Sequence, residues 1–427
     1  MTKIYLMQKW ILVFLLASSA LLFNPFINTD VFEFPKILAF ILSIGILTLV
    51  NIIDIYKNGW PPEINLKPVS KEFCCFVILF FSQMAAYIFS TDREISLMGA
   101  VPRYQGLLIN IHYILLALNT FYFFRKYKDN KSNDVSKWFS IILIIVCITA
   151  VLPYVFPLTF PFYFFTPAFF FNRVYSTFGN PNYLAVFIIG TLPFLIFRKN
   201  LKNIYYYSGV LLVIITLFLT GSRSAWIASI LGFLITGILL AFKLKKYKTL
   251  SVTSIVIILL AAAIGIKAYI APIIPQFERL SLDTPQSTSI QTRSYLWKSG
   301  LKMSLKRPIT GYGQDMIQEN IEPYLPEYLK SNEKFFVDRT HNEFIDILLF
   351  SGIFAFLSYF CLLVLILWRS ARINVSEYVI GPFTAFISLI IFHTVNFSTT
   401  SSNILLYFSM GYLIAAYINA ATHNVFD

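Results

Sequence analysis

The run Asp338-Arg339-Thr340-His341-Asn342-Glu343 closes the longest hydrophilic stretch of the sequence, which begins at Ala271. A long apolar run follows it directly, and apolar runs of similar length fill most of the remaining chain. One helical crossing of a membrane needs about 20 mainly apolar residues. We therefore expect a single transmembrane domain, residues 1–427, with residues 271–342 inserted into it as a loop outside the membrane.

The composition also indicates a membrane protein. Of the 427 residues, 57% are hydrophobic and 13% are charged, whereas soluble proteins average about 45–50% and about 25%. The net charge of +13 is explained more simply by loops that fix membrane topology than by nucleic acid binding. All four cysteines fall within apolar runs and lack metal-ligand spacing. We expect no metal site, no other cofactor and no disulfide framework, and we interpret the first apolar run as a membrane anchor.

The apolar runs predict an all-α polytopic membrane protein with about twelve transmembrane helices. The large loop would lie between the ninth and tenth of these helices and would form short helices of its own. The candidate spans are Met7–Phe23, Phe34–Ile53, Phe73–Ser90, Gly106–Phe124, Trp138–Leu158, Tyr183–Phe197, Tyr205–Thr220, Ala225–Phe242, Ser251–Ile270, Glu343–Trp368, Tyr378–Val395 and Asn403–Ala421.

Lysine and arginine are concentrated in one set of connections between the spans, which is typical of cytoplasmic loops. They occupy residues 3–9, 57–71, 125–137, 198–202, 243–248 and 369–372. The short loops on the opposite side hold only Arg93, Arg103, Arg173 and Arg223. This asymmetry predicts a multi-pass protein of the cytoplasmic membrane, surrounded by its lipids, with both termini in the cytoplasm and residues 271–342 on the extracytoplasmic face.

The four arginines of the short outer loops are candidates for binding an anion. Arg223 lies in the tight turn Gly221-Ser222-Arg223-Ser224-Ala225, where a helix begins and the helix dipole disfavours a cation. A bound anion would remove this conflict, because backbone amides and the guanidinium would face it together. The alternative for each of the four is an arginine that reaches toward lipid phosphates.

The large loop contains a predicted helix from Ser289 to Lys306, which Pro308 ends. Arg293, Trp297 and Leu301 follow one another at intervals of four residues and so share a face. A face with one arginine among apolar residues suits a helix that lies on the membrane or caps the bundle. The alternative is an ordinary interfacial helix on the membrane surface.

Thr340 and Glu343 have the spacing of a capping box, which predicts that the tenth span starts here with His341 as its first helical residue. A helix N-terminus lowers the pKa of a histidine and keeps it neutral, so it can accept a proton. The alternative is a solvent-exposed histidine beside a helix cap.

Asp92 and Glu94 form the only Asp-x-Glu pair of the short outer loops. Two such carboxylates would suit a metal-dependent glycosyltransferase. Because Arg93 lies between them, we favour a loop whose charges neutralise one another.

These elements together resemble the O-antigen ligase and polymerase superfamily of bacterial membrane proteins. The resemblance covers about Arg173 to Gly352, and the order and spacing of the motifs agree with the family pattern. The motifs are Arg173 followed by Thr177-Phe178-Gly179-Asn180-Pro181-Asn182-Tyr183-Leu184-Ala185, then Gly221-Ser222-Arg223-Ser224-Ala225, Arg293-x3-Trp297, Pro308-x2-Gly311-x-Gly313, His341-Asn342-Glu343-Phe344 and Ser351-Gly352.

The resemblance implies a GT-C-like fold and an inverting, metal-independent glycosyltransferase of the bacterial cytoplasmic membrane. Its donor would be a glycan linked to undecaprenyl diphosphate, and its acceptor lipid A core or another glycan. His341 would act as the general base, and Arg223 and Arg293 would hold the diphosphate. Further candidates for binding substrate are Arg103, Arg173, Asn180, Asn182, Trp297 and Asn342.

The sequence leaves several functions open. Within the family, the acceptor could be lipid A core (a ligase), the growing glycan (a polymerase), a protein hydroxyl (an oligosaccharyltransferase) or a wall polymer. Outside it, twelve spans also suit a transporter or lipid flippase. A major-facilitator transporter has two six-span halves with a longer central cytoplasmic link, whereas residues 198–204 form a short one here. A purely structural membrane protein is the third possibility.

Overall fold

A computed structural model describes residues 3–24, 31–61, 64, 66–127, 135–155, 173–197, 204–244, 287–327, 337–372 and 377–423. The predicted ninth span, Ser251–Ile270, and the first part of the large loop lie outside the described residues. Within the described ranges, the regular structure is entirely helical.

Eleven helices of the described chain correspond to predicted spans. Seven are long and apolar enough to cross a membrane, and four shorter apolar helices accompany them. The helices are α1 (Lys3–Leu21), α2 (Glu33–Asn58), α3 (Ser70–Ile88), α5 (Leu107–Lys126), α6 (Val135–Val155), α7 (Pro181–Ile196), α8 (Ile204–Leu219), α9 (Arg223–Leu244), α14 (Glu343–Ser370), α15 (Glu377–Val395) and α16 (Thr400–His423). The all-α polytopic class is confirmed, and the total of twelve spans stays a prediction.

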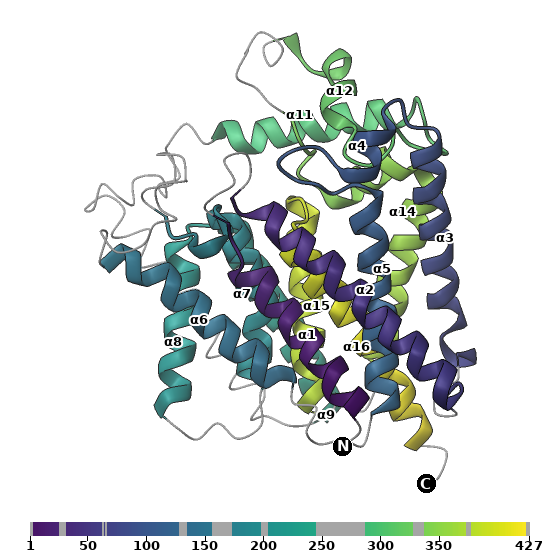
Figure 1. Cartoon of the computed structure of the whole chain (residues 1–427). Helices are drawn as coiled ribbons and strands as arrows, with labels where there is room; N and C mark the ends of the chain where they lie inside the picture. The colour runs from purple at the N-terminus through teal and green to yellow at the C-terminus, as the bar shows by residue number, and fades with distance from the viewer. Residues whose placement is uncertain are drawn as a thin grey trace.

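Short helices cover one end of this bundle. They are α4 (Arg93–Met98), α11 (Ser287–Ser304), α12 (Ile317–Asn320) and the 3₁₀ turn η6 (Glu322–Tyr324). Helix α11 lies across the end of the bundle and packs on α14, whereas α1 begins and α16 ends at the opposite end (Figure 1). The predicted helix from Ser289 to Lys306 is therefore confirmed with nearly the same bounds.

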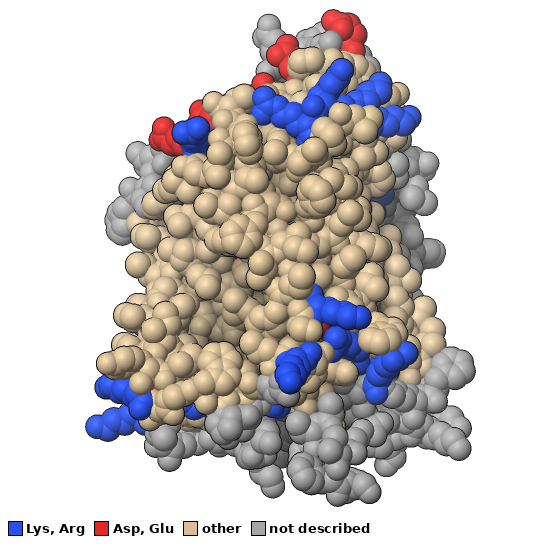
Figure 2. Space-filling model, turned by 90° about the vertical axis from the view of Figure 1, so that its right-hand side faces the viewer, with Lys and Arg blue, Asp and Glu red and all other residues tan. Residues whose placement is uncertain are grey.

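The outer surface has the layering expected of a membrane protein. Figure 2 shows a broad band of uncharged residues between two levels of lysine and arginine. Large apolar side chains are exposed in the spans, as at Phe81 of α3 and Phe354 of α14. An apolar band of this kind suits contact with lipid, and the basic residues at its edges suit the headgroup regions.

The large loop docks on α14 through backbone hydrogen bonds. Gly352 has a φ of 76° and interrupts the helical backbone. The interruption leaves the carbonyl oxygens of Leu349 and Phe350 available, and they accept hydrogen bonds from the backbone N–H groups of Tyr312 and Gly313, each at 3.0 Å. The Gly-x-Gly and Ser-Gly motifs of the sequence thus fasten the loop to the bundle.

Candidate active site

The tenth span starts at Glu343, as the apolar run predicted, and not at His341, as the capping box predicted. Asn342 is the N-cap of α14, and its side-chain oxygen accepts hydrogen bonds from the N–H groups of Phe344 and Ile345 at 3.0 and 3.2 Å. His341 lies before the helix with a φ of 61°. The predicted capping box at Thr340 is therefore wrong, because the amide side chain of Asn342 takes the capping role and the hydroxyl of Thr340 is engaged elsewhere.

The segment around His341 is held by contacts of its neighbours. The carboxylate oxygen Oδ1 of Asp346 accepts hydrogen bonds from the backbone N–H of Thr340 at 2.9 Å and from its hydroxyl at 2.7 Å. On the other side, Oε2 of Glu343 accepts a hydrogen bond from the N–H of Ser398 at 3.0 Å. The left-handed backbone of His341 is thus fixed from both sides, which is a common arrangement at functional sites.

The imidazole of His341 lies half-buried beside an aromatic ring. Its ring centroid is 4.9 Å from that of Phe397, which lies between α15 and α16. Its Nδ1 is buried without a hydrogen-bond partner. Burial and the nearby charge of Arg293 lower the pKa of His341 to about 4, although Asp338 opposes this shift. The predicted direction of the pKa shift is supported, with burial as its main cause.

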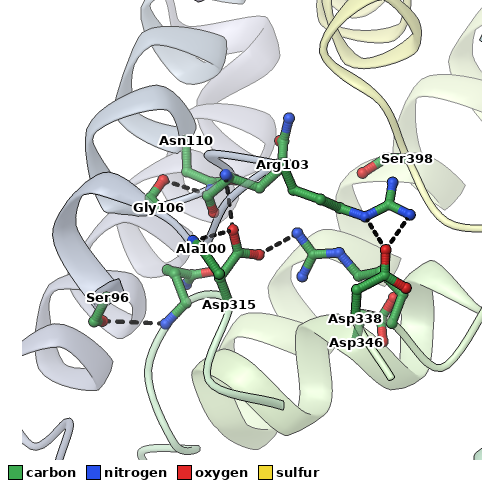
Figure 3. A network of polar contacts seen from close by, with 12 residues as sticks. Ser96, Ala100, Arg103, Gly106, Asn110, Asp315, Asp338, Asp346 and Ser398 are labelled. Atoms are coloured by element: carbon green, nitrogen blue, oxygen red, sulfur yellow. Dashed lines mark hydrogen bonds and ion pairs between the residues drawn. The ribbon is translucent and has the colours of Figure 1, made fainter. Parts of the chain in front are cut away.

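Arg103 reaches the same aromatic ring from the loop after α4. Its guanidinium carbon lies 3.7 Å from the centroid of Phe397. Its Nε and Nη2 contact Oδ2 of Asp338 at 2.6 and 2.5 Å (Figure 3). Its Nη1 donates to the hydroxyl of Tyr183 at 2.7 Å. Burial alone would lower the pKa of Arg103, but the negative charge of Asp338 helps to raise it. Arg103 is therefore held charged beside His341.

Arg339, the residue after Asp338, forms a second ion pair. Arg339 contacts Oδ1 of Asp315, and both side chains are almost fully buried. The other carboxylate oxygen of Asp315 accepts hydrogen bonds from the N–H groups of Ala100 and Gln105 at 3.1 and 2.8 Å (Figure 3). Breaking a buried pair on one side costs about 3–5 kcal/mol. The two ion pairs thus join the loop after α4 firmly to the segment before α14.

Arg293 projects from α11 to the segment between α15 and α16. Its Nη1 donates a hydrogen bond to the carbonyl oxygen of Val395 at 2.8 Å, and its Nη2 lies 3.4 Å from the side-chain oxygen of Asn396. Asn396 in turn donates to the hydroxyl of Ser224 at 2.6 Å. Burial lowers the pKa of Arg293. Asn396 therefore connects the predicted arginine of the loop helix to the first turn of α9.

Arg223 is the first residue of α9, as predicted, and its side chain is exposed. It adjoins Ser224, which Asn396 links to Arg293. Asn396 and Ser224 thus connect Arg293 to the residue that follows Arg223 in the chain.

The remaining predicted residues have structural contacts. Arg173 donates from Nε to the carbonyl oxygen of Thr220 and from Nη2 to the side-chain oxygen of Asn182 at 3.0 Å. Asn180 is the N-cap of α7 and accepts from the N–H of Asn182 at 2.9 Å. These three predicted binding residues join the start of α7 to the turn before α9.

Trp297 and Asn342 border the same region from α11 and α14. The indole Nε1 of Trp297 is buried without a hydrogen-bond partner. The amide nitrogen of Asn342 donates to the carbonyl oxygen of Thr394 at 2.8 Å, and its oxygen caps α14. Both polar ends of Asn342 are thus engaged by the protein itself.

The residues before Asn403 were missed by the sequence reasoning. Asn396 and Phe397 lie in a polar break between two spans, and this break is the signal that could have indicated them. Asp338 and Asp315 were missed because their partners, Arg103 and Arg339, could not be assigned from spacing. Asp338 and Arg103 are 235 residues apart in the chain.

A small polar cavity lies behind the start of α14. Its volume is about 30 Å³, and its lining includes Gln105, Arg339, Glu343, Asp346 and Asn403. A space of this size accommodates a water molecule and excludes a sugar. This cavity is therefore too small for a sugar substrate.

The acidic residues of this end have defined roles in the fold. Asp92 is the N-cap of α4 and accepts a hydrogen bond from the N–H of Ile95 at 3.0 Å. In the part of the chain that the structure describes, no three His, Cys, Asp or Glu side chains come together as a group that could hold a metal ion.

The arrangement suits proton transfer beside a bound anion. A neutral imidazole can accept a proton, and the guanidinium groups of Arg103 and Arg293 lie close enough to influence its charge. Positive groups fixed near a developing negative charge stabilise it without reorganisation.

Two comparisons with known proteins agree with the resemblance in the sequence. Residues 208–360 match the family model described as O-Antigen ligase. A protein named General O-oligosaccharyltransferase from Acinetobacter baylyi is 26% identical over 232 residues, which are 49% of this chain and 38% of that protein. The match thus spans well under two thirds of the relative's own length. The predicted family resemblance is confirmed.

Proposed function

We propose that this chain, which is similar to the O-antigen ligase family over residues 208–360, transfers a glycan from undecaprenyl diphosphate to an acceptor hydroxyl. The acceptor in this proposal is a sugar hydroxyl such as one of lipid A core, and the reaction takes place at the outer face of the cytoplasmic membrane. The likeness to a General O-oligosaccharyltransferase favours one second candidate, transfer to a protein hydroxyl.

The observation that carries the proposal is the setting of His341. The imidazole stands in a left-handed turn, half-buried, next to Phe397 and under the influence of Arg103 and Arg293. His341 precedes the start of α14 by two residues, and α14 packs with α11, which lies across the end of the bundle opposite the start of α1 (Figure 1). A basic nitrogen beside two fixed positive charges supports a reaction in which an anion leaves as a hydroxyl is deprotonated.

The proposed step is a single displacement with inversion. The proton of the acceptor hydroxyl moves to His341 while the hydroxyl oxygen bonds to the anomeric carbon. The bond from that carbon to the diphosphate breaks, and the diphosphate keeps the electron pair. Arg223 and Arg293 stabilise the leaving anion, and the planar guanidinium groups can orient it by paired hydrogen bonds.

The test is transfer by purified protein in lipid nanodiscs with a labelled polyprenyl-diphosphate glycan. We expect His341→Ala to remain folded and to lose transfer by about 10²–10⁴-fold, since that is the usual contribution of a general base. His112→Ala is the matched control, because His112 lies on α5 and bonds the carbonyl of Leu108. Undiminished transfer by His341→Ala would disprove the mechanism.

The acceptor is tested in the same assay. Lipid A core, unlabelled glycan and a serine-rich acceptor protein are offered separately. Labelled product on the glycolipid supports the ligase, whereas label on the acceptor protein supports the second candidate.

A further inference from the structure

The base assigned above has an unusual setting for its task. The Nδ1 of His341 is buried and has no hydrogen-bond partner among the residues that the structure describes. A histidine base works best when its second nitrogen is held by an acceptor. Burial and two neighbouring arginines also weaken the basicity of this imidazole in the unliganded protein. A hydrogen-bond acceptor that reaches Nδ1 only when the glycan donor is bound would hold the second nitrogen and would also raise the pKa of the imidazole.

Asp338 is suited to be that acceptor. It precedes His341 by three residues, and Arg103 binds it through a single oxygen, Oδ2 (Figure 3). Its Oδ1 accepts no hydrogen bond from any residue in the described ranges. The side chain of Asp338 is 25% exposed, compared with 10% for Arg103. The carboxylate therefore has an unused oxygen and room to turn.

We propose that Asp338 is a positioning residue with two successive partners: Arg103 in the unliganded enzyme, and the Nδ1–H of His341 once a phosphate group of the donor engages Arg103. This inference rests on the proposed function. It gives Arg103 a role that differs from simple attraction of substrate, because the arginine releases a carboxylate when it binds an anion.

The geometry favours an exchange of side-chain partners over a movement of the backbone. Arg103 and His341 both lie against the ring of Phe397, at 3.7 Å and 4.9 Å from its centroid. The backbone between Asp338 and His341 is held, because Arg339 pairs with Asp315 and Thr340 is bonded to Asp346. Rotation of the Asp338 side chain is then sufficient, and a phosphate can replace the carboxylate as the paired acceptor of a guanidinium.

The exchange prepares the imidazole for the proposed step. With Nδ1–H donated to Asp338, the lone pair of Nε2 is directed to the acceptor hydroxyl. The hydroxyl proton moves to Nε2, the oxygen bonds to the anomeric carbon, and the diphosphate leaves with the electron pair. Asp338 stays ionised throughout and stabilises the imidazolium that forms.

The charged groups that face His341 are known for each packed element. Arg293 comes from α11, Arg103 from the loop after α4 and Asp338 from its own segment. Glu343, at the start of α14, accepts a hydrogen bond from the N–H of Ser398. The segment between α15 and α16 contributes the uncharged Phe397. Asp338 is the anion whose effect on the imidazole is resolved.

The experiment compares two pH profiles in nanodiscs, with the same labelled donor. The acidic limb of the kcat/KM profile reports the pKa of the base in the free enzyme. The acidic limb of the kcat profile reports its pKa in the complex with substrate. For the wild type we expect the acidic limb of the kcat profile to lie at a higher pH than the acidic limb of the kcat/KM profile. For Asp338→Asn we expect the gap between the limbs to narrow and kcat to fall about 10-fold or more, with KM changed far less.

Two variants separate this role from a structural one. Asp338→Glu keeps the carboxylate and should restore much of the pH difference between the two acidic limbs that the wild type shows. Asp92→Asn is the matched control, because asparagine caps a helix as well as aspartate does, and it should leave both limbs unchanged. A gap in folded Asp338→Asn equal to that of the wild type would overturn the inference.

The two proposals fail differently. Full transfer by His341→Ala would remove the proposed mechanism and this inference together. Loss of transfer by His341→Ala, combined with an unchanged gap in Asp338→Asn, would remove this inference alone.

Discussion

At the scale of single residues, the site is built from charges that restrain one another. Asp338 holds Arg103 and influences His341, and Asp315 holds Arg339. Burial would raise the pKa of Asp338, but Arg103 lowers it overall, so the carboxylate stays ionised. The side chains are thus arranged before substrate arrives, and their protonation states follow from the pairing.

The pH dependence of kcat/KM tests the state of His341 in the free enzyme. Its pKa is lowered to about 4, so the active neutral form persists as pH falls and is lost only near that value. We expect kcat/KM to stay level between about pH 7.5 and 5.5, whereas an ordinary histidine would lose half its activity near about 6.5. A half-maximal rate at that higher pH, measured on protein that recovers fully on return to neutral pH, would contradict the burial of the base.

The two arginines should differ in what their removal changes. Arg223 is exposed, so Arg223→Ala should lower kcat by about 10²–10³-fold with little effect on thermal unfolding. Arg293 also bonds the carbonyl of Val395, so Arg293→Ala should lower both kcat and the unfolding temperature. Transfer assays and unfolding in detergent measure the two effects. Equal kcat values for Arg223→Ala and the wild type would remove Arg223 from the proposal.

At the scale of elements, α14 connects the large loop to the bundle. Its first turn carries the contacts of Asn342 and Asp346, and its kink at Gly352 accepts the loop. One helix therefore fixes both the turn of His341 and the position of the segment that covers it.

The cap of α14 can be tested by a pair of substitutions. Asn342→Ala removes the acceptor of two N–H groups and should destabilise the protein by about 0.5–2 kcal/mol. Asn342→Ser keeps a capping oxygen and should recover most of this loss. Unfolding in detergent and KM for the donor are measured together. If Asn342→Ala raised KM without affecting unfolding, Asn342 would bind substrate and its cap would contribute little.

The kink in α14 is tested by Gly352→Ala. A Cβ at this position would lie 2.0 Å from the carbonyl oxygen of Ile309, and the φ of 76° disfavours any side chain. The strained backbone alone costs about 1–3 kcal/mol. We expect a lower unfolding temperature and faster proteolysis of the large loop. Gly45→Ala is the control, because no atom lies within 4 Å of its added Cβ.

At the scale of the whole molecule, the two ends of the bundle differ in character. One end holds the short helices and the candidate site, and the other holds the start of α1 and the end of α16 (Figure 1). A band of uncharged surface separates them (Figure 2). Chemistry at one end would therefore be confined to one side of a membrane.

The proposed orientation is tested by labelling single cysteines in a chain whose four native cysteines are replaced. Lys302→Cys lies on α11 and Lys57→Cys near the end of α2, and both native side chains are exposed. In intact spheroplasts, an impermeant maleimide should label residue 302 and should reach residue 57 only after permeabilisation. The reverse pattern would place the site in the cytoplasm.

The sequence by itself determined the spans that the structure describes, because an apolar run of span length must bury its backbone polar groups within a helix. It also indicated His341 and Arg223, since each stands at a local break between elements, and Arg293, since it shares one face of a predicted helix with Trp297. Only the tertiary structure decided which residue caps α14 and the pairing of Asp338 with Arg103 across 235 residues. Local periodicity carries no information on such pairs, because they depend on which distant charges become buried together.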